Sequence, residues 1–145
     1  MTEFHDSARV GLIPGGDAAL YYDGRFAATP EQAKRFNRIR WITVIGDYRH
    51  CGIIDYEPGE ADYSPGRLRA FVQGRKDMNC RARVYCNRSD FPGAQKAVEG
   101  LPVEWWISTL DGNKLDAHWT HGLWAEQYAG GMDAQYDTSV LYGEW

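Results

Sequence analysis

The chain has 145 residues, of which 43% are hydrophobic and 25% charged, and its formal net charge is −4. This composition is typical of one soluble globular domain and excludes a largely disordered chain. Because the sequence contains no basic block, it does not favour a nucleic-acid groove, which depends on phosphate neutralisation. No apolar run approaches the ~20 residues that a membrane-spanning helix needs, and no secretory signal is visible at the N-terminus.

Strand-like segments recur along the chain, with helices between several of them. We expect an irregular arm over residues 1–17. Seven strands should follow, because seven runs of β-branched or aromatic residues each end at a turn residue. They are predicted at residues 18–22, 41–45, 52–55, 82–86, 103–107, 123–128 and 136–142.

Three helices are predicted between these strands. The first two begin at Thr29 and Ser64, each of which is an N-cap residue followed by proline. The three helices should extend from Thr29 to Phe36 or Arg38, from residue 64 to 76, and from residue 92 to 98. Alternating strands and helices predict parallel β/α units. The expected fold class is therefore α/β: a reduced (β/α) barrel of the TIM type, with about seven parallel strands and short helices, in one domain over residues 1–145.

Two acids stand at the end of the apolar run Ile53-Ile54. Residues two apart on a strand point to the same side, so Asp55 and Glu57 should share one face while Tyr56 lies on the other. Repulsion between two adjacent carboxylates separates their pKa values, which lets one keep a proton near neutral pH. That division is the chemistry of glycoside hydrolysis. The alternative is a solvated strand end with two ordinary acids.

Further acids lie at other strand ends, where (β/α) barrels carry their reactive groups. Asp23 follows the first predicted strand, Asp47 the second and Asp111 the fifth. An acidic rim suits sugar cleavage or a hard metal ion. It gives little support to a serine nucleophile, because no serine lies in a Gly-x-Ser-x-Gly motif.

Metal and disulfide chemistry have weaker support. His118 and His121 form a His-x-x-His pair, which we interpret as two surface histidines. The cysteines, at 51, 80 and 86, lack zinc-site spacing. Three reduced thiols are the default, with a Cys51–Cys80 disulfide left open. We therefore expect no cofactor and no metal.

Four motifs occur in an order that is informative. Ile53-Ile-Asp-Tyr-Glu57 is an Asp-x-Glu strand, and residues 84–87 end a later strand with tyrosine and a small polar residue. Residues 124–128 are a Trp-x-x-Gln-Tyr strand, and residues 136–140 place an aspartate in the last strand. This order resembles the glycoside hydrolase family 25 lysozymes and the related glycoside hydrolase-like barrel domains of actinobacteria and their phages.

The resemblance implies a muramidase that cleaves the β-1,4 bond of peptidoglycan, the bacterial cell-wall glycan. It assigns Glu57 as the general acid and Asp55 as the group that positions or stabilises the reacting sugar, with Asp23 and Asp137 completing the acidic rim. The residues implied to contact the sugar or to shape the floor of the site are Tyr22, Tyr85, Trp106, Trp124, Gln127 and Tyr128. The sequence departs from the family pattern in three respects. The chain is short, and one β/α unit between the first strand and the Asp-x-Glu strand is expected to be lost or reduced to Gly46–His50. The first strand carries Asp-Gly where the lysozymes usually have Asp-x-Ser.

Other functions stay open. The chain could be a non-catalytic phage structural protein (of the virion, tail or its decoration) or a wall-binding module that retains the barrel. A metal-dependent hydrolase is a third alternative. The expected partner is bacterial cell-wall polysaccharide, with other virion proteins under the structural alternative, and neither nucleic acid nor membrane. Without a secretory signal, the expected location is the host cytoplasm or a phage virion.

Overall fold

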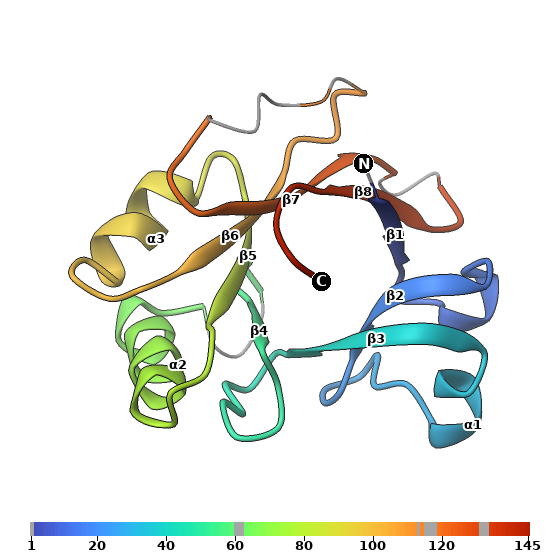
Figure 1. Cartoon of the computed structure of the whole chain (residues 1–145), viewed down its shortest axis with the longest axis horizontal. Coiled ribbons are helices and arrows are strands. Elements are labelled where there is room, and N and C mark those ends of the chain that lie inside the picture. Colours follow the sequence, from blue (N-terminus) through green and yellow to red (C-terminus); the bar gives the residue numbers. More distant parts are fainter. Residues whose placement is uncertain (1, 60–62, 113, 115–118, 131–133) are drawn as a thin grey trace.

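The computed structural model shows a closed barrel (Figure 1). The structure describes residues 2–59, 63–112, 114, 119–130 and 134–145. In this part of the chain the strands are β1 (Thr2–Asp6), β2 (Gly16–Tyr21), β3 (Phe36–Thr43), β4 (Ile53–Asp55), β5 (Arg83–Asn87), β6 (Glu104–Ser108), β7 (Leu123–Ala129) and β8 (Asp137–Leu141). The helical elements are η1 (Val10–Leu12), α1 (Pro30–Ala33), α2 (Pro65–Asp77) and α3 (Phe91–Ala97).

The strands follow one another around the barrel in chain order. Neighbours from β1 to β7 are parallel, whereas β8 runs antiparallel to both β7 and β1. The link between β7 and β8 covers only residues 130–136, and a parallel crossover needs a dozen residues or more. A closed barrel is confirmed. It is mostly sheet rather than a clear (β/α) barrel of the TIM type, and the prediction that its last strand is parallel is wrong.

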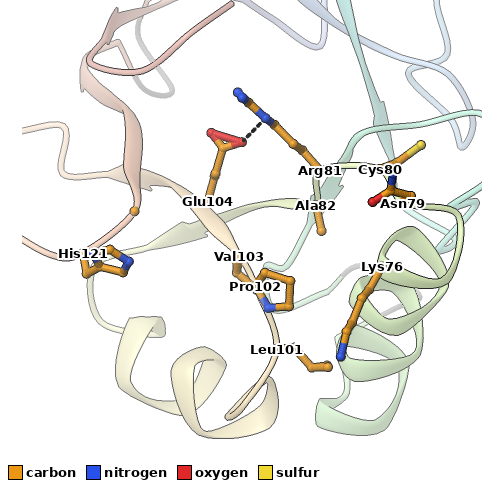
Figure 2. Close-up of a pocket in the computed structure, with 11 residues that line it drawn as sticks. Lys76, Asn79, Cys80, Arg81, Ala82, Leu101, Pro102, Val103, Glu104 and His121 are labelled. Atoms are coloured by element: carbon orange, nitrogen blue, oxygen red, sulfur yellow. Dashed lines mark ion pairs between the residues drawn. The ribbon is translucent and has the colours of Figure 1, made fainter.

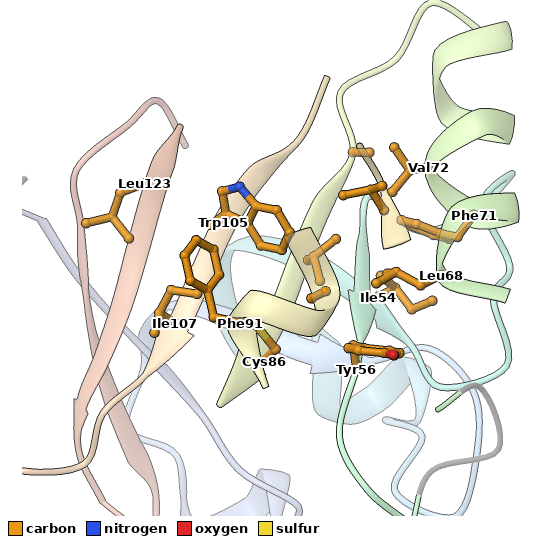
Figure 3. Close-up of a cluster of buried hydrophobic side chains, with 14 residues drawn as sticks. Ile54, Tyr56, Leu68, Phe71, Val72, Cys86, Phe91, Trp105, Ile107 and Leu123 are labelled. Atoms are coloured by element: carbon orange, nitrogen blue, oxygen red, sulfur yellow. The ribbon is translucent and has the colours of Figure 1, made fainter. Parts of the chain in front are cut away.

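Sheet dominates this barrel, and the helices cover only part of its outer surface. α2 and α3 pack over the side that contains β4 to β7 (Figure 1). Outward side chains such as Ile54 and Trp105 meet Leu68 and Phe71 of α2 and Phe91 of α3 (Figure 3). Burying one such side chain contributes about 1.5–3 kcal/mol, so this outer cluster fixes both helices to the sheet.

The N-terminal segment is a strand, which corrects the expectation of an irregular arm over residues 1–17. β1 pairs with β8 through five register positions, including Phe4 with Ser139, and with β2 at His5. Phe4 points into the barrel and is fully buried. With β1 counted, the Asp-x-Glu strand is the fourth in the barrel. β1 precedes the first predicted strand, and only β3 lies between that strand and the Asp-x-Glu strand.

The first predicted helix is shorter than expected. Thr29 and Gln32 form a capping box, as the sequence predicts, yet α1 ends at Ala33. β3 begins at Phe36, because that residue pairs with Gly16 of β2. Sheet pairing therefore overrides the continuation of the helix to Phe36 or Arg38.

Aromatic rings fill the middle of the barrel. The Phe4 ring centroid lies 5.1 Å from that of Trp106 and 5.5 Å from that of Trp124. At the amino-terminal mouth, where β1 to β7 begin, Trp145 packs on Phe4 with centroids 5.2 Å apart. The Arg83 guanidinium lies 4.4 Å from the centroid of the Trp124 ring. The interior is a packed core rather than a pore, and the C-terminal residues close this mouth.

Two remaining expectations concern cysteines and membranes. The cysteines are all free: Cys51 and Cys86 are buried, and Cys80 is exposed. The structure thus contains no disulfide at Cys51, Cys80 or Cys86. No helix within the described residues is long and apolar enough to cross a membrane.

Candidate active site at the carboxyl mouth

The Asp-x-Glu strand places Asp55 inside the barrel. Along β4 the side chains alternate, so Ile53 is inside, Ile54 is in the outer cluster, and Asp55 is inside again. Tyr56 joins the outer cluster, as the two-residue period predicts. Asp55 is only 1% exposed, and its Oδ2 accepts a hydrogen bond of 2.8 Å from the Tyr21 hydroxyl. The carboxylate is thus fixed at the carboxyl mouth, where β1 to β7 end.

Glu57 lies above Asp55 and is half-buried. Its charge is close enough to raise the pKa values of Asp6 and Tyr85, which belong to two different strands. Both acids of the motif therefore lie at the carboxyl mouth. Asp55 is buried, and Glu57 is partly exposed to solvent.

Two further acids meet at this mouth from β1 and β8. Asp6 and Asp137 are register partners in the antiparallel pair β1–β8. Burial and the charges of Asp137 and Glu57, opposed by a hydrogen bond from Gln127 that lowers it, together raise the pKa of Asp6 to about 8. Asp6 therefore keeps its proton at neutral pH. The mouth thus brings the protonated Asp6 together with Asp55 of β4 and Asp137 of β8.

Two phenols complete the polar layer. Tyr21 donates to Asp55, and Tyr85 donates from its hydroxyl to Gln127 Oε1 at 2.8 Å. Burial, together with the nearby carboxylates, raises the pKa of each phenol well above its usual value. Both tyrosines therefore stay protonated and act as hydrogen-bond donors.

Asp23 does not join this layer. Its carboxylate accepts hydrogen bonds from the Thr43 hydroxyl and from the backbone N–H of Val44, the latter at 2.7 Å. Thr43 is the register partner of Ile54, which faces outward. Asp23 thus braces the end of β3 on the outer side. Asp6, and not Asp23, contributes the additional acid to the mouth.

The six residues expected to contact sugar divide between the inside and the outside of the barrel. Trp106 and Trp124 are almost fully buried in the core, so they form the floor rather than a stacking surface. Tyr85 and Gln127 lie above them in the polar layer. The other two lie elsewhere: Tyr22 stacks on His50, and Tyr128 donates to Glu3.

Sequence reasoning missed three members of this layer: Asp6, Tyr21 and Ser108. The Ser108 hydroxyl donates to Gln127 Oε1 at 3.0 Å from the end of β6. A signal existed for Asp6, because Phe4 and Asp6 repeat the pattern of an apolar inward residue followed two positions later by an acid. Tyr21 and Ser108 carried no signal beyond their position at a strand end.

An open groove of about 710 Å³ lies at the opposite end of the barrel. It is lined by residues that precede or begin β5 and β6, such as Ala82 and Val103, and by the end of α2 (Figure 2). Its acid, Glu104, lies 3.8 Å from Arg81 and 3.5 Å from Arg83. Glu104 is the one acid among the lining residues and is paired with these cations, so the groove holds no pair of acids, and the acidic mouth remains the candidate site.

Gly130 leaves the space that Asp137 occupies. Its φ is +133°, and an added Cβ would lie 1.8 Å from Asp137 Oδ1 and 2.8 Å from Asp137 Cα. We expect Gly130→Ala to lower the free energy of unfolding by about 1–3 kcal/mol in urea titrations, as backbone strain of this kind does. Gly16→Ala is the matched control, because Gly16 has a φ of +118° and nothing within 4 Å of an added Cβ. Equal costs for the two variants would contradict close packing of Asp137 against Gly130.

The described residues contain no group of three or more His, Cys, Asp or Glu side chains arranged to hold a metal ion. His121 is exposed, and His118 lies outside the described residues.

Comparisons with protein-family models, curated proteins and solved structures find no match to this chain. The geometry of the carboxyl mouth therefore carries the functional argument.

Proposed function

We propose that this protein is a glycoside hydrolase-like barrel, related to the family 25 lysozymes, that cleaves the β-1,4 bond of bacterial cell-wall glycan at its carboxyl mouth. The observation that carries the proposal is the convergence of four acids, Asp6, Asp55, Glu57 and Asp137, from three separate parts of the chain. In (β/α) barrels this end of the strands bears the reactive groups. The parallel course of β1 to β7 and the outer helices α2 and α3 support a relationship to that class of barrel.

In the proposed reaction, Glu57 gives a proton to the leaving oxygen of the glycosidic bond. It is suited to this step because it is partly exposed while Asp55 below it is buried. The reacting sugar gains positive charge in such reactions. Asp55, held by Tyr21, and Asp137 would stabilise that charge. A water molecule then bonds to the anomeric carbon in place of the broken C–O bond and returns a proton to Glu57. Asp6 would act as a proton reserve beside these acids.

The test is release of reducing ends from purified peptidoglycan by the whole chain, followed together with loss of turbidity. We expect both signals to rise with protein concentration and to persist in EDTA, since the proposed chemistry uses no metal. Activity that is lost in EDTA and restored by a divalent cation would instead support a metal-dependent hydrolase.

A non-catalytic function has its own support in the burial of the acids. Asp55 is 1% and Asp6 is 5% exposed, so two of the four carboxylates lie below the surface. A wall-binding or virion protein would keep this buried layer for stability alone. Co-sedimentation with peptidoglycan without release of reducing ends, or detection of the chain in purified phage particles, would favour that function.

A further inference from the structure

The Gln127 side chain links Asp6 to two hydroxyl groups across the barrel interior. Its Nε2 donates to both oxygens of Asp6, at 3.1 and 3.0 Å. Its Oε1 accepts from the Tyr85 hydroxyl at 2.8 Å and from the Ser108 hydroxyl at 3.0 Å. All four side chains are at least nine-tenths buried, so water contributes little to the network.

This pattern of donors and acceptors selects one orientation of the amide. An amide presents a donor N–H₂ group on one side and an acceptor oxygen on the other. In the observed orientation the two hydroxyls face the oxygen, and the N–H₂ group faces the carboxyl of Asp6. A flipped amide would turn its oxygen toward Asp6, and an ionised carboxylate has no proton to share with it. The two hydroxyls thus hold Gln127 in the orientation that favours an ionised Asp6.

We propose that Gln127 is a positioning residue: oriented by the hydroxyls of Tyr85 and Ser108, it keeps Asp6 able to release its proton inside the acidic mouth. The inference deepens the proposed function, and only its catalytic meaning rests on that function. The hydrogen bonds themselves exist whether or not the mouth cleaves a glycan.

The groups around Asp6 explain why such a residue matters. Asp137 faces it from β8 and Glu57 from the end of the Asp-x-Glu strand, while Tyr21 and Tyr85 are near enough to interact with its charge. Burial and the two acids raise the pKa of Asp6 to about 8, and among its described neighbours only Gln127 lowers it. Without Gln127, the pKa of Asp6 would rise further, and its proton would be released only at a still higher pH.

The test is a titration of the whole chain, labelled with ¹³C at its aspartate carboxyl groups and followed by NMR from pH 5 to 10, with Asp6→Asn to assign the signal. Gln127→Met keeps the length of the side chain and removes the amide. Hydrogen bonds to charged groups contribute about 1.5–3 kcal/mol, and 1.36 kcal/mol corresponds to one pH unit. We therefore expect the Asp6 midpoint to rise by about 1 pH unit or more. An unchanged or lower midpoint would overturn the proposal.

Two further variants test the orientation of the amide without touching Gln127 or Asp6. Tyr85→Phe and Ser108→Ala each remove one donor to Oε1, so each should raise the Asp6 midpoint by less than Gln127→Met does. Ser139→Ala is the matched control, because this interior serine accepts a hydrogen bond from Trp106 and not from Gln127. The Asp6 midpoint in this variant should equal that of the wild type. If Gln127→Met does not fold, the two hydroxyl variants decide, and midpoints that match the wild type refute the proposal.

The titration needs no substrate, so it separates this inference from the proposed function. If the protein is inactive on peptidoglycan but shows the shifts in the Asp6 midpoint, the positioning role of Gln127 stands and the proposed hydrolase function is refuted. In an active protein, the pH profile of kcat/KM should shift in Gln127→Met together with the Asp6 midpoint. A profile that stays in place while the midpoint moves would exclude Asp6 from the reaction.

Discussion

Glu57→Gln should lower the release of reducing ends from peptidoglycan by about 10²- to 10⁴-fold, the usual contribution of a general acid. Glutamine has nearly the same shape as glutamate but has no carboxyl proton to give to the leaving oxygen. Because Glu57 is half-buried and extends from the end of β4, the substitution should leave the fold intact. Initial rates on purified peptidoglycan, measured with the circular dichroism spectrum of each variant, provide the check.

Two comparisons make this result specific. Glu31→Gln alters an exposed acid on α1 and should retain the wild-type rate. Asp23→Asn should also keep most of the activity, since Asp23 braces Thr43 and Val44 outside the mouth. Wild-type activity in Glu57→Gln, or a large loss in Asp23→Asn with the fold intact, would show that the acidic mouth is not the catalytic centre.

The second large effect concerns pH and stability. Burial raises the pKa of Asp6 from 3.8 to about 8 in the folded chain. Between these values the folded state binds a proton that the unfolded state has already released. The stability contributed by this proton is therefore complete below pH 4 and is lost as pH rises towards 8. The slope for one such group is at most about 1.4 kcal/mol per pH unit.

Asp6→Asn should remove most of that slope, because asparagine resembles the protonated carboxyl and does not titrate. Urea denaturation at pH 5, 6, 7 and 8 should show wild-type stability falling relative to the variant by roughly 3 kcal/mol across this range. Glu31→Gln should follow the wild type. Parallel curves for the wild type and Asp6→Asn would mean that Asp6 is ionised in the folded protein at neutral pH.

Most strands were predictable because their signals are local. Runs such as residues 103–107 and 123–128 are apolar, short and followed by turn residues, and both lie within one residue of the observed strands. The start of α1 was predictable for the same reason, since Thr29 and Gln32 lie three positions apart and cap each other. Its end was not, because no local signal separates the last helical turn from the first residues of β3.

β1 was missed because its pattern has meaning only within the barrel. Thr2-Glu3-Phe4-His5-Asp6 contains one large apolar residue, and its polar members are tolerated because they either face outward or join the polar layer. The direction of β8 also depends on context, in this case on the short link after β7. Pairing across more than 130 residues leaves no trace in a local window.

The candidate site divides in the same way. Asp55 and Glu57 were predicted to share a side because side chains two residues apart on a strand point in the same direction, and this spacing can be read from the sequence alone. The meeting of Asp6 with Asp137 depends on the pairing of β1 with β8. The exclusion of Asp23 depends on where β2 stops, since that strand ends at Tyr21 and the following turn directs the acid to Thr43.

The pairing of the first strand with the last has a consequence for biosynthesis. β1 is synthesised before its partner β8, which begins at Asp137. Contacts between such distant segments form slowly, and here they cannot form until β8 has been translated. A nascent chain therefore keeps Asp6 and Asp137 apart, and the acidic mouth is assembled only after the last strand of the barrel has left the ribosome.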